Sequence, residues 1–192
     1  MWDKLLKIKT SGRDDSNSDQ YRYPYEPTPY SVLERLANSG FIGKKDVLLD
    51  YGCGKGRVSF FLNNQTNCRT TGVDFDENMI GAALENANRR GLNEKIDFVC
   101  ESAERYEIND ADIFYFFNPF SAEVLKSVIG KIRNSYYENP REMILFFYYP
   151  SDEYVSYLMT VPELYFLDEI NCQDLFEGEN HRERILVLGR DM

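Results

Sequence analysis

The segment VLLDYGCGKGRVSFFL, residues 47–62, restricts the fold of this chain more than any other feature. A short apolar run ends at Asp50 and is followed by three glycines at alternate positions, Gly52, Gly54 and Gly56. A helix-like stretch begins immediately afterwards. Glycines in such a turn let the backbone bend sharply and come close to a ligand. The pattern predicts a β-strand, a ligand-binding turn and an α-helix in direct succession.

Two nucleotide-binding patterns do not fit this turn. A P-loop needs G-x4-G-K-[S/T], but Leu49 stands where its first glycine belongs and Gly56 stands where its hydroxyl belongs. A dinucleotide fingerprint needs G-x-G-x-x-G, but position 57 is Arg and the third glycine comes one residue early. An acidic residue two positions before the first glycine also suits a cationic ligand better than a pyrophosphate.

Strand-like and helix-like blocks alternate along most of the chain. The predicted strands are 46–50, 69–74, 95–100, 111–117, 142–149, 164–170 and 184–188, and the predicted helices are 28–40, 56–64, 77–90, 121–136 and a short one that begins at Ser151. A polar loop without helical periodicity separates the last two strands. We therefore predict a doubly wound α/β fold around a seven-stranded mixed sheet, with an antiparallel strand pair at its C-terminal end.

We predict a flexible N-terminal tail over residues 1–20 and a single domain over residues 21–192. Residues 21–40 form a Tyr- and Pro-rich strap followed by a helix. No apolar run is long enough to span a membrane, and the four cysteines show neither disulfide nor zinc-site spacing. We expect reduced thiols, no bound metal, no membrane partner and a cytoplasmic location.

The balance of charge disfavours nucleic acid as a partner. The 192 residues include 22 Lys and Arg against 32 Asp and Glu, so the formal net charge is −10. Such a surface repels a phosphate backbone unless basic residues cluster locally. A folded RNA stays open as a substrate.

The glycine-rich segment resembles motif I of the class I S-adenosylmethionine-dependent methyltransferases. The resemblance implies a Rossmann-like methyltransferase fold, S-adenosylmethionine as the cofactor and methyl transfer as the reaction. It also implies that the cofactor is bound by residues of this segment and, in our prediction, by Tyr30 at the end of the strap; the segment residues are Asp50, Gly52, Cys53, Gly54 and Gly56.

The two following strands end in further predicted cofactor contacts. Asp74 ends the second strand at the distance where a carboxylate binds a ribose diol, and the resemblance places Phe75 against the adenine. After the third strand the family has an acidic residue followed by Ala. Here the matching pair is Ser102-Ala103, with Glu101 one position early, so either Ser102 or Glu101 is expected to contact the adenine.

The fourth strand ends in Asn118-Pro119-Phe120, which is similar to the N-P-P-Y motif of amino-methylating family members. In that motif an Asn and a carbonyl hold the target nitrogen and the aromatic ring stacks on it. The resemblance makes these three residues the predicted catalytic residues, with Asn118 also beside the cofactor. The alternative is a turn whose Phe120 belongs to the core.

The acceptor is predicted to be a nitrogen of a protein side chain or of a small molecule, because in-line methyl transfer to an amine needs positioning more than a dedicated base. We expect acceptor contacts from residues 21–30, 118–121 and 171–182, with the strap folding over the cofactor as a lid. Two alternatives stay open: a non-catalytic module that binds S-adenosylmethionine, and an NAD-dependent oxidoreductase.

Overall fold

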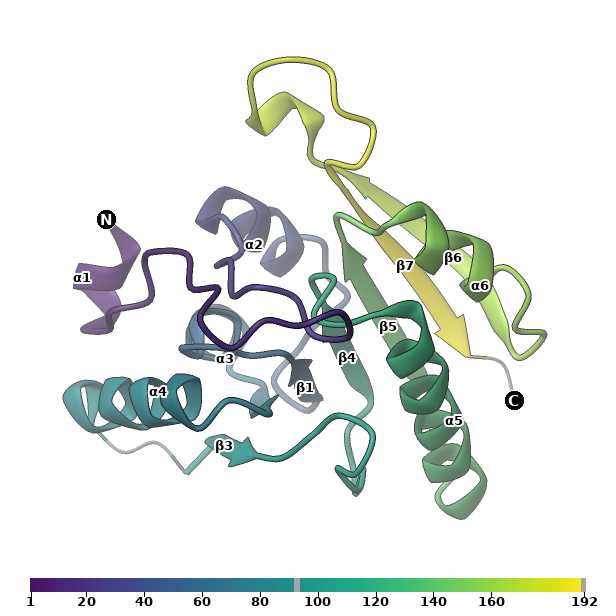
Figure 1. Ribbon diagram of the computed structural model, residues 1–192, viewed down its shortest axis with the longest axis horizontal. Helices are drawn as coiled ribbons and strands as arrows, with labels where there is room; N and C mark the ends of the chain where they lie inside the picture. Colours follow the sequence, from purple (N-terminus) through teal and green to yellow (C-terminus); the bar gives the residue numbers. More distant parts are fainter. Residues whose placement is uncertain (92–93, 191–192) are drawn as a thin grey trace.

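The computed structural model describes residues 1–91 and 94–190, and these form a single seven-stranded sheet in the order β3-β2-β1-β4-β5-β7-β6 (Figure 1). The strands are β1 (Val47–Tyr51), β2 (Arg69–Asp74), β3 (Ile96–Cys100), β4 (Ile113–Phe116), β5 (Met143–Tyr148), β6 (Leu164–Asn171) and β7 (Arg184–Arg190). The first five are parallel, whereas β7 runs antiparallel to both β5 and β6. The predicted mixed sheet with its antiparallel C-terminal pair is therefore confirmed.

The helices are α1 (Trp2–Leu6), α2 (Tyr30–Ala37), α3 (Arg57–Thr66), α4 (Glu77–Arg90), α5 (Ala122–Glu138) and α6 (Asp152–Leu158), with a 3-10 turn, η1 (Gln173–Leu175), between β6 and β7. Three of the helices, α3, α4 and α5, connect successive parallel strands as crossovers, whereas α1 and α2 precede β1 and α6 follows β5. Three helix starts have the side-chain caps that their sequences favour. Asp76 accepts from the Asn78 amide, Ser121 from the Val124 amide and Ser151 from the Tyr154 amide.

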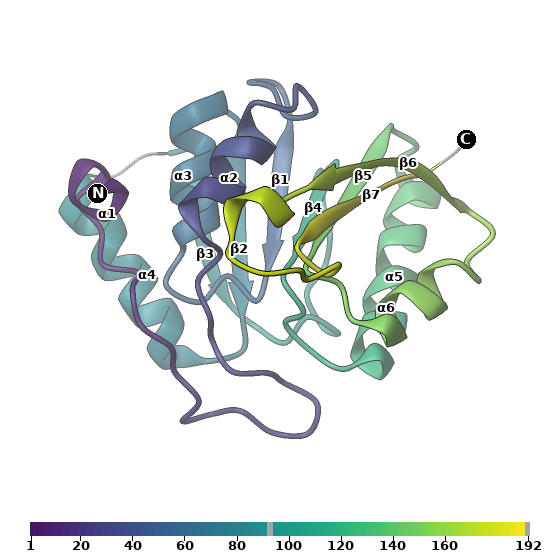
Figure 2. The ribbon, with the colours of Figure 1, turned by 90° about the horizontal axis from the view of Figure 1, so that it is seen from above.

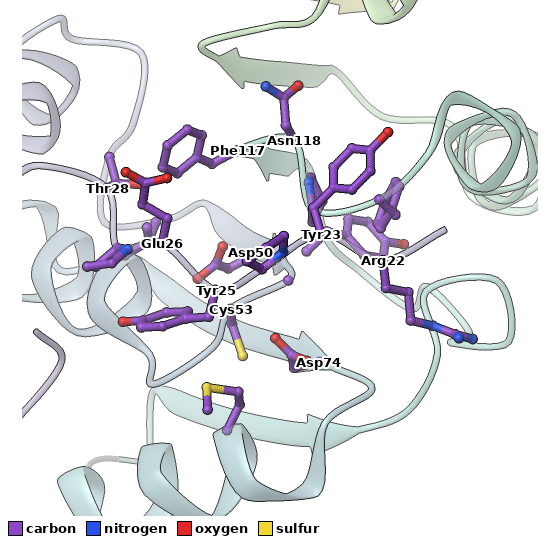
Figure 3. Close-up of a pocket in the computed structure, with 18 of the residues that line it drawn as sticks. Arg22, Tyr23, Tyr25, Glu26, Thr28, Asp50, Cys53, Asp74, Phe117 and Asn118 are labelled. Carbon is purple, nitrogen blue, oxygen red and sulfur yellow. The ribbon is translucent and has the colours of Figure 1, made fainter. Parts of the chain in front are cut away.

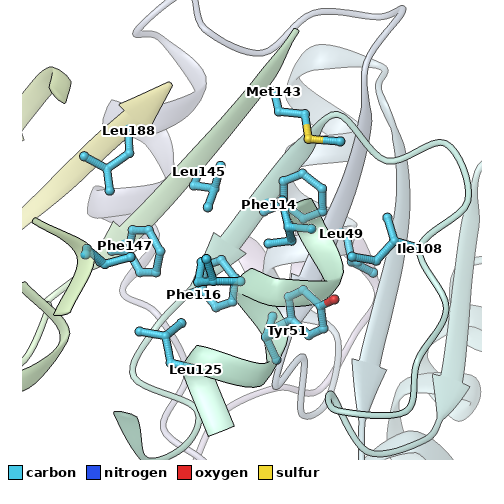
Figure 4. Packing of buried hydrophobic residues seen from close by; sticks show 14 of the residues in the cluster. Leu49, Tyr51, Ile108, Phe114, Phe116, Leu125, Met143, Leu145, Phe147 and Leu188 are labelled. Carbon is cyan, nitrogen blue, oxygen red and sulfur yellow. The ribbon is translucent and has the colours of Figure 1, made fainter. Parts of the chain in front are cut away.

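The core lies on both faces of the sheet because successive side chains of a strand point to opposite sides. On one face, Leu49, Phe114, Phe116 and Phe147 pack under α5 and α6, as Figure 4 shows for this cluster. On the other face, side chains such as Leu48 pack against α2 and α3. The continuously apolar strands of the sequence are thus strands covered on both faces.

The first ten residues are packed on the domain, which differs from the flexible tail predicted for residues 1–20. Leu6 and Ile8 are buried beside α2 and α3, and the Trp2 ring meets the Phe61 ring edge-on at 5.0 Å. The side chain of Asp3 accepts hydrogen bonds from the amide and hydroxyl of Thr10. The apolar residues of this short helix pack on an apolar surface of the domain, so residues 1–10 are held against it.

The carboxyl ends of β1, β2 and β4 meet at one edge of the sheet. β1 pairs with β2 on one side and with β4 on the other, and the chain order reverses between these two neighbours. Open α/β sheets bind ligands outside such a switch point. The segment from residue 10 to residue 29, in dark purple in Figure 1, crosses in front of this edge.

Candidate active site

A cavity of about 450 Å³ lies between the carboxyl ends of the strands and the strap. Asp50, Gly52, Asp74 and Asn118 line it from the sheet side, and residues 22–29 line it from the strap side. Figure 3 shows Asp74 at one end, with Glu26, Phe117 and Asn118 at the other. Residues predicted separately from the ends of three strands are therefore brought together around one space.

The glycine-rich turn is held against β2 by backbone hydrogen bonds. The amides of Gly52 and Cys53 both donate to the Val73 carbonyl, at 2.8 and 3.1 Å. Gly52 has a φ of +72°, and a Cβ added there would lie 2.4 Å from the Cβ of Pro119. A side chain at position 52 is therefore excluded both by the backbone conformation and by the turn that follows β4.

At Gly54 the glycine-rich turn comes close to the strap. Its φ is +51°, and an added Cβ would lie 2.1 Å from the ring of Tyr25, which comes from the strap. The Gly54 amide donates to a carboxylate oxygen of Asp74 at 2.9 Å. Gly52 and Cys53 line the cavity, whereas Gly54 and Gly56 do not. Gly54 is covered by the ring of Tyr25, and Gly56 by the rings of Phe98 and Phe60. These two glycines shape the turn rather than the cavity wall.

Asp50 is a buried carboxylate that faces the cavity, with only 2% of its surface exposed. The Ser59 hydroxyl donates a hydrogen bond to it at 3.4 Å. Burial, followed by repulsion from Asp74, raises the pKa of Asp50 to about 8. Within residues 1–91 and 94–190, Asp50 forms no ion pair. A ligand with an ammonium and a sulfonium supplies the missing positive charge, so the residues present fit S-adenosylmethionine.

Asp74 and Phe75 form the other end of the cavity. The two Asp74 oxygens accept from the amides of Gly54 and Asp76, at 2.9 and 3.0 Å, which fixes the carboxylate in place. Burial raises its pKa, in competition with these hydrogen bonds, which lower it. Phe75 exposes about a third of its surface, and the Arg22 guanidinium of the strap lies 4.7 Å from its ring centroid.

The loop after β3 presents Glu101 and Ala103 to the cavity, whereas Ser102 is not part of the described lining. The Ser102 amide donates to a carboxylate oxygen of Glu101 at 2.9 Å. Of the two residues expected at the adenine, Glu101 is thus the one that lines the cavity.

Asn118 connects the ends of β4 and β5. Its side-chain amide donates to the Tyr149 carbonyl at 2.5 Å, and its side-chain oxygen accepts from the Ser151 amide at 3.2 Å. Asn118 has a φ of +39° and Tyr149 a φ of +51°, conformations that non-glycine residues seldom adopt. Pro119 and Phe120 also line the cavity, and Phe120 is 5% exposed and belongs to the core as well.

Tyr30 lies away from the described cavity lining. Its hydroxyl donates to Asp3, and the Arg57 guanidinium lies 4.4 Å from its ring centroid. The residue of the strap that covers the glycine-rich turn is instead Tyr25, whose hydroxyl donates to the Thr10 carbonyl at 2.7 Å. The many Tyr and Pro residues before α2 indicated that this segment contributes to the site. They did not indicate which tyrosine covers the glycine-rich turn.

The strap is bonded to the turn that follows β4, a relation that the sequence analysis missed. The Tyr23 amide donates to the Pro119 carbonyl at 3.2 Å, and the Ser121 amide donates to the Tyr21 carbonyl at 2.7 Å. Arg57, which is nearly buried, donates to the Thr10 hydroxyl and to the Thr28 carbonyl from α3. The strap is therefore attached on both sides of the cavity.

The end of the cavity beyond Asn118 is aromatic and acidic. Phe117, Tyr149 and Phe176 line it together with Glu26 and Glu183. Arg182 also reaches this end, where it donates to the Pro150 and Tyr149 carbonyls and stacks 4.3 Å from the Tyr149 ring centroid. The Glu183 carboxylate accepts from the Tyr148 hydroxyl at 2.7 Å. Glu26, by contrast, is exposed and forms no side-chain hydrogen bond or ion pair within the described part of the chain.

Three observations concern the chain as a whole. The four cysteines are free, as predicted, and three of them are buried. Over the residues that the structure describes, no group of His, Cys, Asp and Glu is arranged to hold a metal ion. No helix in that part of the chain is long and apolar enough to cross a membrane.

Comparisons with known proteins agree with this geometry. Residues 48–135 match a family model described as a methyltransferase domain. A protein-lysine N-methyltransferase of Saccharolobus islandicus is 27% identical over 95 residues, which are 49% of this chain and 59% of that protein. A ribosomal protein L11 methyltransferase of Yersinia pestis is 30% identical over 87 residues, 45% of this chain and 29% of that protein. The chain thus spans less than two thirds of these curated relatives.

Solved structures share the fold across most of the chain. An RNA methyltransferase from Salinibacter ruber, in complex with S-adenosyl-L-homocysteine, has a TM-score of 0.54 at 21% identity and covers 86% of this chain and 92% of its own. Magnesium protoporphyrin IX methyltransferase from Synechocystis, with bound S-adenosylmethionine, has a TM-score of 0.59 at 18% identity, over 84% and 77%. These findings support S-adenosylmethionine as the cofactor. The resemblance of the glycine-rich segment is confirmed: residues 48–135 match a methyltransferase-domain model, and the chain has the Rossmann-like fold of S-adenosylmethionine-dependent methyltransferases.

Proposed function

We propose that the protein is an S-adenosylmethionine-dependent N-methyltransferase whose acceptor is an amine, on a protein side chain or a small molecule. The observation that carries this proposal is the distribution of charge along the cavity. Asp50 is a buried carboxylate without a cationic partner in the described chain, and Glu26 is a free carboxylate at the aromatic end. Asp50 would pair with the positive charge of the cofactor, and Glu26 would pair with a protonated amine.

The residues divide the cavity into a cofactor end and an acceptor end. Asp74 and Phe75 would hold the ribose and the adenine, with Glu101 beside the adenine. Asp50 and the turn at Gly52 would hold the amino acid part. When bound, S-adenosylmethionine supplies a methyl group on a sulfonium, which is a good leaving group. This division places the reacting groups near Asn118.

At the acceptor end the chain's own residues orient the amine and exclude water. Phe117 and Tyr149 offer ring faces, which attract an ammonium group, and Glu26 adds a carboxylate. Both polar groups of the Asn118 side chain already bond to the Tyr149–Ser151 backbone, so we assign it to positioning Tyr149. The bound ammonium would first give one proton to water, which frees the nitrogen lone pair to attack the methyl carbon, and the C–S bond would break with the neutral thioether as the leaving group.

A protein lysine is the acceptor favoured by these features. The relative from Saccharolobus islandicus is named a protein-lysine N-methyltransferase, and a lysine side chain is long enough to reach into a lined cleft. The chain's net charge of −10 attracts basic polypeptides and repels phosphate backbones. Other relatives and neighbours are named for rRNA or small-molecule substrates, so RNA is a comparison arm of the test. The cytoplasmic location predicted from the sequence stays a prediction.

The test is transfer of labelled methyl from S-adenosylmethionine to three acceptors: a lysine-rich peptide, the same peptide with its lysines acetylated, and RNA. We expect label on the free lysine peptide only. Transfer to RNA alone would overturn the amine proposal. Tight cofactor binding without transfer to any acceptor, including proteins of a cell extract, would favour the non-catalytic module instead.

The role of Glu26 is tested by Glu26→Gln, with Glu142→Gln as the matched control. Glu142 is exposed, immediately precedes β5 and does not line the cavity. We expect E26Q to raise the KM for the peptide roughly tenfold, the effect of losing one charge-assisted contact, while the Kd for S-adenosylmethionine stays unchanged. Equal KM values in E26Q and E142Q would remove Glu26 from the acceptor site.

A further inference from the structure

A second cavity, of about 190 Å³, lies at the opposite end of the sheet from the cofactor cavity. It is enclosed by α5, the segment from Tyr157 to Leu164, and the adjoining parts of β5 and β7. Figure 1 and Figure 2 together show α5 and α6 on the same side of β5, β7 and β6. Arg190 pairs with Met143, the first residue of β5, whereas Tyr148 at the other end of β5 lines the cofactor cavity. Met143 and Tyr148 are five positions apart along β5, which corresponds to about 17 Å.

Arg190 is a buried cation on the wall of this cavity. Only 5% of its surface is exposed, and its guanidinium lies 3.8 Å from the ring centroid of Tyr136 and 5.1 Å from that of Tyr137. It donates Nη1 to the Arg133 carbonyl at 3.1 Å, but its buried Nε has no hydrogen-bond partner in the structure. Burying a charge without a counterion is costly. Within the described residues, no carboxylate forms an ion pair with Arg190.

The remaining charges of the lining increase the positive potential. Lys126, Arg133 and Arg190 line the cavity against one carboxylate, Glu163. Glu163 lies 3.7 Å from an Arg133 nitrogen, so this ion pair leaves Lys126 and Arg190 without a carboxylate partner in residues 1–91 and 94–190. A local excess of cations stands out in a chain whose net charge is −10.

The rest of the lining is apolar and leaves a space beside α5. Ile129, Leu145, Val161 and Leu164 contribute aliphatic surface. Gly130 lies in the middle of α5, where glycine costs about 1 kcal/mol relative to alanine. A Cβ built at Gly130 meets nothing within 4 Å. The glycine therefore keeps open a space that almost any other residue would begin to fill.

We propose that this cavity is a binding site for a small organic anion, a monocarboxylate with an apolar body. The carboxylate would accept hydrogen bonds from the Arg190 guanidinium, with Lys126 at the rim, and the body would pack on the aliphatic side chains beside Gly130. The volume lies below the range of about 300–1,000 Å³ that is typical of larger ligands, so the ligand is small. This site is separate from the methyl-transfer site and does not depend on the proposed function.

The test is calorimetric titration of the full chain with benzoate, with its uncharged isostere benzamide and with inorganic phosphate. We expect saturable binding of benzoate, at least about tenfold tighter than either of the other two, since a hydrogen-bonded ion contact and apolar burial act together. Equal affinity for benzamide would overturn the role of Arg190. Equal affinity for phosphate would overturn the role of the apolar wall, and absence of benzoate binding would overturn the site.

A variant that fills the second cavity tests where benzoate binds and leaves the charged side chains in place. Gly130→Leu fills the space beside α5, and Gly81→Leu is the matched control on α4, where an added Cβ also meets nothing within 4 Å. Both variants replace a helical glycine by a good helix former, so both should fold. We expect G130L to abolish benzoate binding and G81L to leave it unchanged. Benzoate binding that survives in G130L would overturn the proposal, whatever the effect of Arg190→Gln.

Discussion

The side-chain amide of Asn118 donates to the backbone carbonyl of Tyr149 at 2.5 Å, and both residues have left-handed backbone conformations. Each conformation costs free energy when the residue is not glycine. The hydrogen bond therefore joins two strained positions, at the ends of β4 and β5, beside the aromatic end of the cavity. Strain of this kind persists where surrounding contacts hold it in place.

Asn118→Ala should lower both stability and turnover. The substitution removes the hydrogen bonds to Tyr149 and Ser151, at a cost of roughly 1–3 kcal/mol in the free energy of unfolding. Tyr149 would then relax, so kcat should fall more than the affinity for S-adenosylmethionine. Denaturant unfolding and methyl-transfer kinetics measure the two effects. Tyr149→Phe is the control, since it keeps the ring and loses only the bond from Asn180; a larger kcat loss in Y149F than in N118A would contradict this assignment.

Gly54→Ala should weaken S-adenosylmethionine binding at least tenfold. The added Cβ overlaps the Tyr25 ring, so the strap must move away from the glycine-rich turn, and overpacking of this kind costs roughly 1–3 kcal/mol. Gly178→Ala is the matched control, because Gly178 has a φ of +87° but open space around its Cβ position. It should show only the backbone cost, about 1 kcal/mol, in unfolding experiments. Equal cofactor affinities for G54A and G178A would argue against a role for the contact with Tyr25.

The pKa of Asp50 makes stability and cofactor binding depend on pH in opposite directions. An unfolded Asp titrates near 3.9, whereas Asp50 in the folded, ligand-free chain titrates at about 8. Between these values the folded chain holds a proton that the unfolded chain does not, so this group makes the free energy of unfolding fall as pH rises from about 4 to about 8. A cationic cofactor favours the ionised carboxylate, so its affinity should rise over the upper part of that range.

Asp50→Asn separates the two effects. The variant should lose this part of the pH dependence of unfolding and should be at least as stable as the parent near pH 8, because an amide replaces an uncompensated buried carboxylate. Its affinity for S-adenosylmethionine should be low at every pH. Denaturant unfolding and calorimetry from about pH 5 to about pH 9 measure both quantities. A variant that binds the cofactor as tightly as the parent would remove Asp50 from the cofactor site.

Arg22→Gln should weaken cofactor binding several-fold. Arg22 places its guanidinium over the Phe75 ring and joins the strap to the adenine end of the cavity, a contact that contributes about 0.5–2 kcal/mol. Arg89→Gln is the control, because Arg89 is also a surface arginine with a carboxylate partner nearby in sequence, on α4. Calorimetry with S-adenosylmethionine compares the two. Point variants are preferable to truncation before Thr28, which would also expose the faces that Leu6 and Ile8 cover.

Local sequence patterns predicted the sheet and the strand ends, whereas contacts between distant segments escaped them. Asp50 ends the apolar run of β1 and Asp74 ends the next predicted strand, so their positions at one edge of the sheet followed from the fold class. The contact of Tyr25 with Gly54 and the hydrogen bond of Asn118 to Tyr149 join segments about 30 residues apart in sequence, and the positive φ of Tyr149 is not predicted by its residue type. Tyr30, which we predicted at the cofactor, does not line the cavity, because its hydroxyl bonds to Asp3 in a helix held by long-range contacts.

The backbone hydrogen bonds between the strap and residues 119–121 have a kinetic consequence. Tyr21 and Tyr23 are bonded to the same turn whose Asn118 holds Tyr149, so a single turn joins the strap to the aromatic end of the cavity. Opening the strap to admit a ligand from that side would break these hydrogen bonds. On the proposed function, we expect exchange of the cofactor and entry of the acceptor to be coupled, with opening of the strap limiting the rate of the cycle.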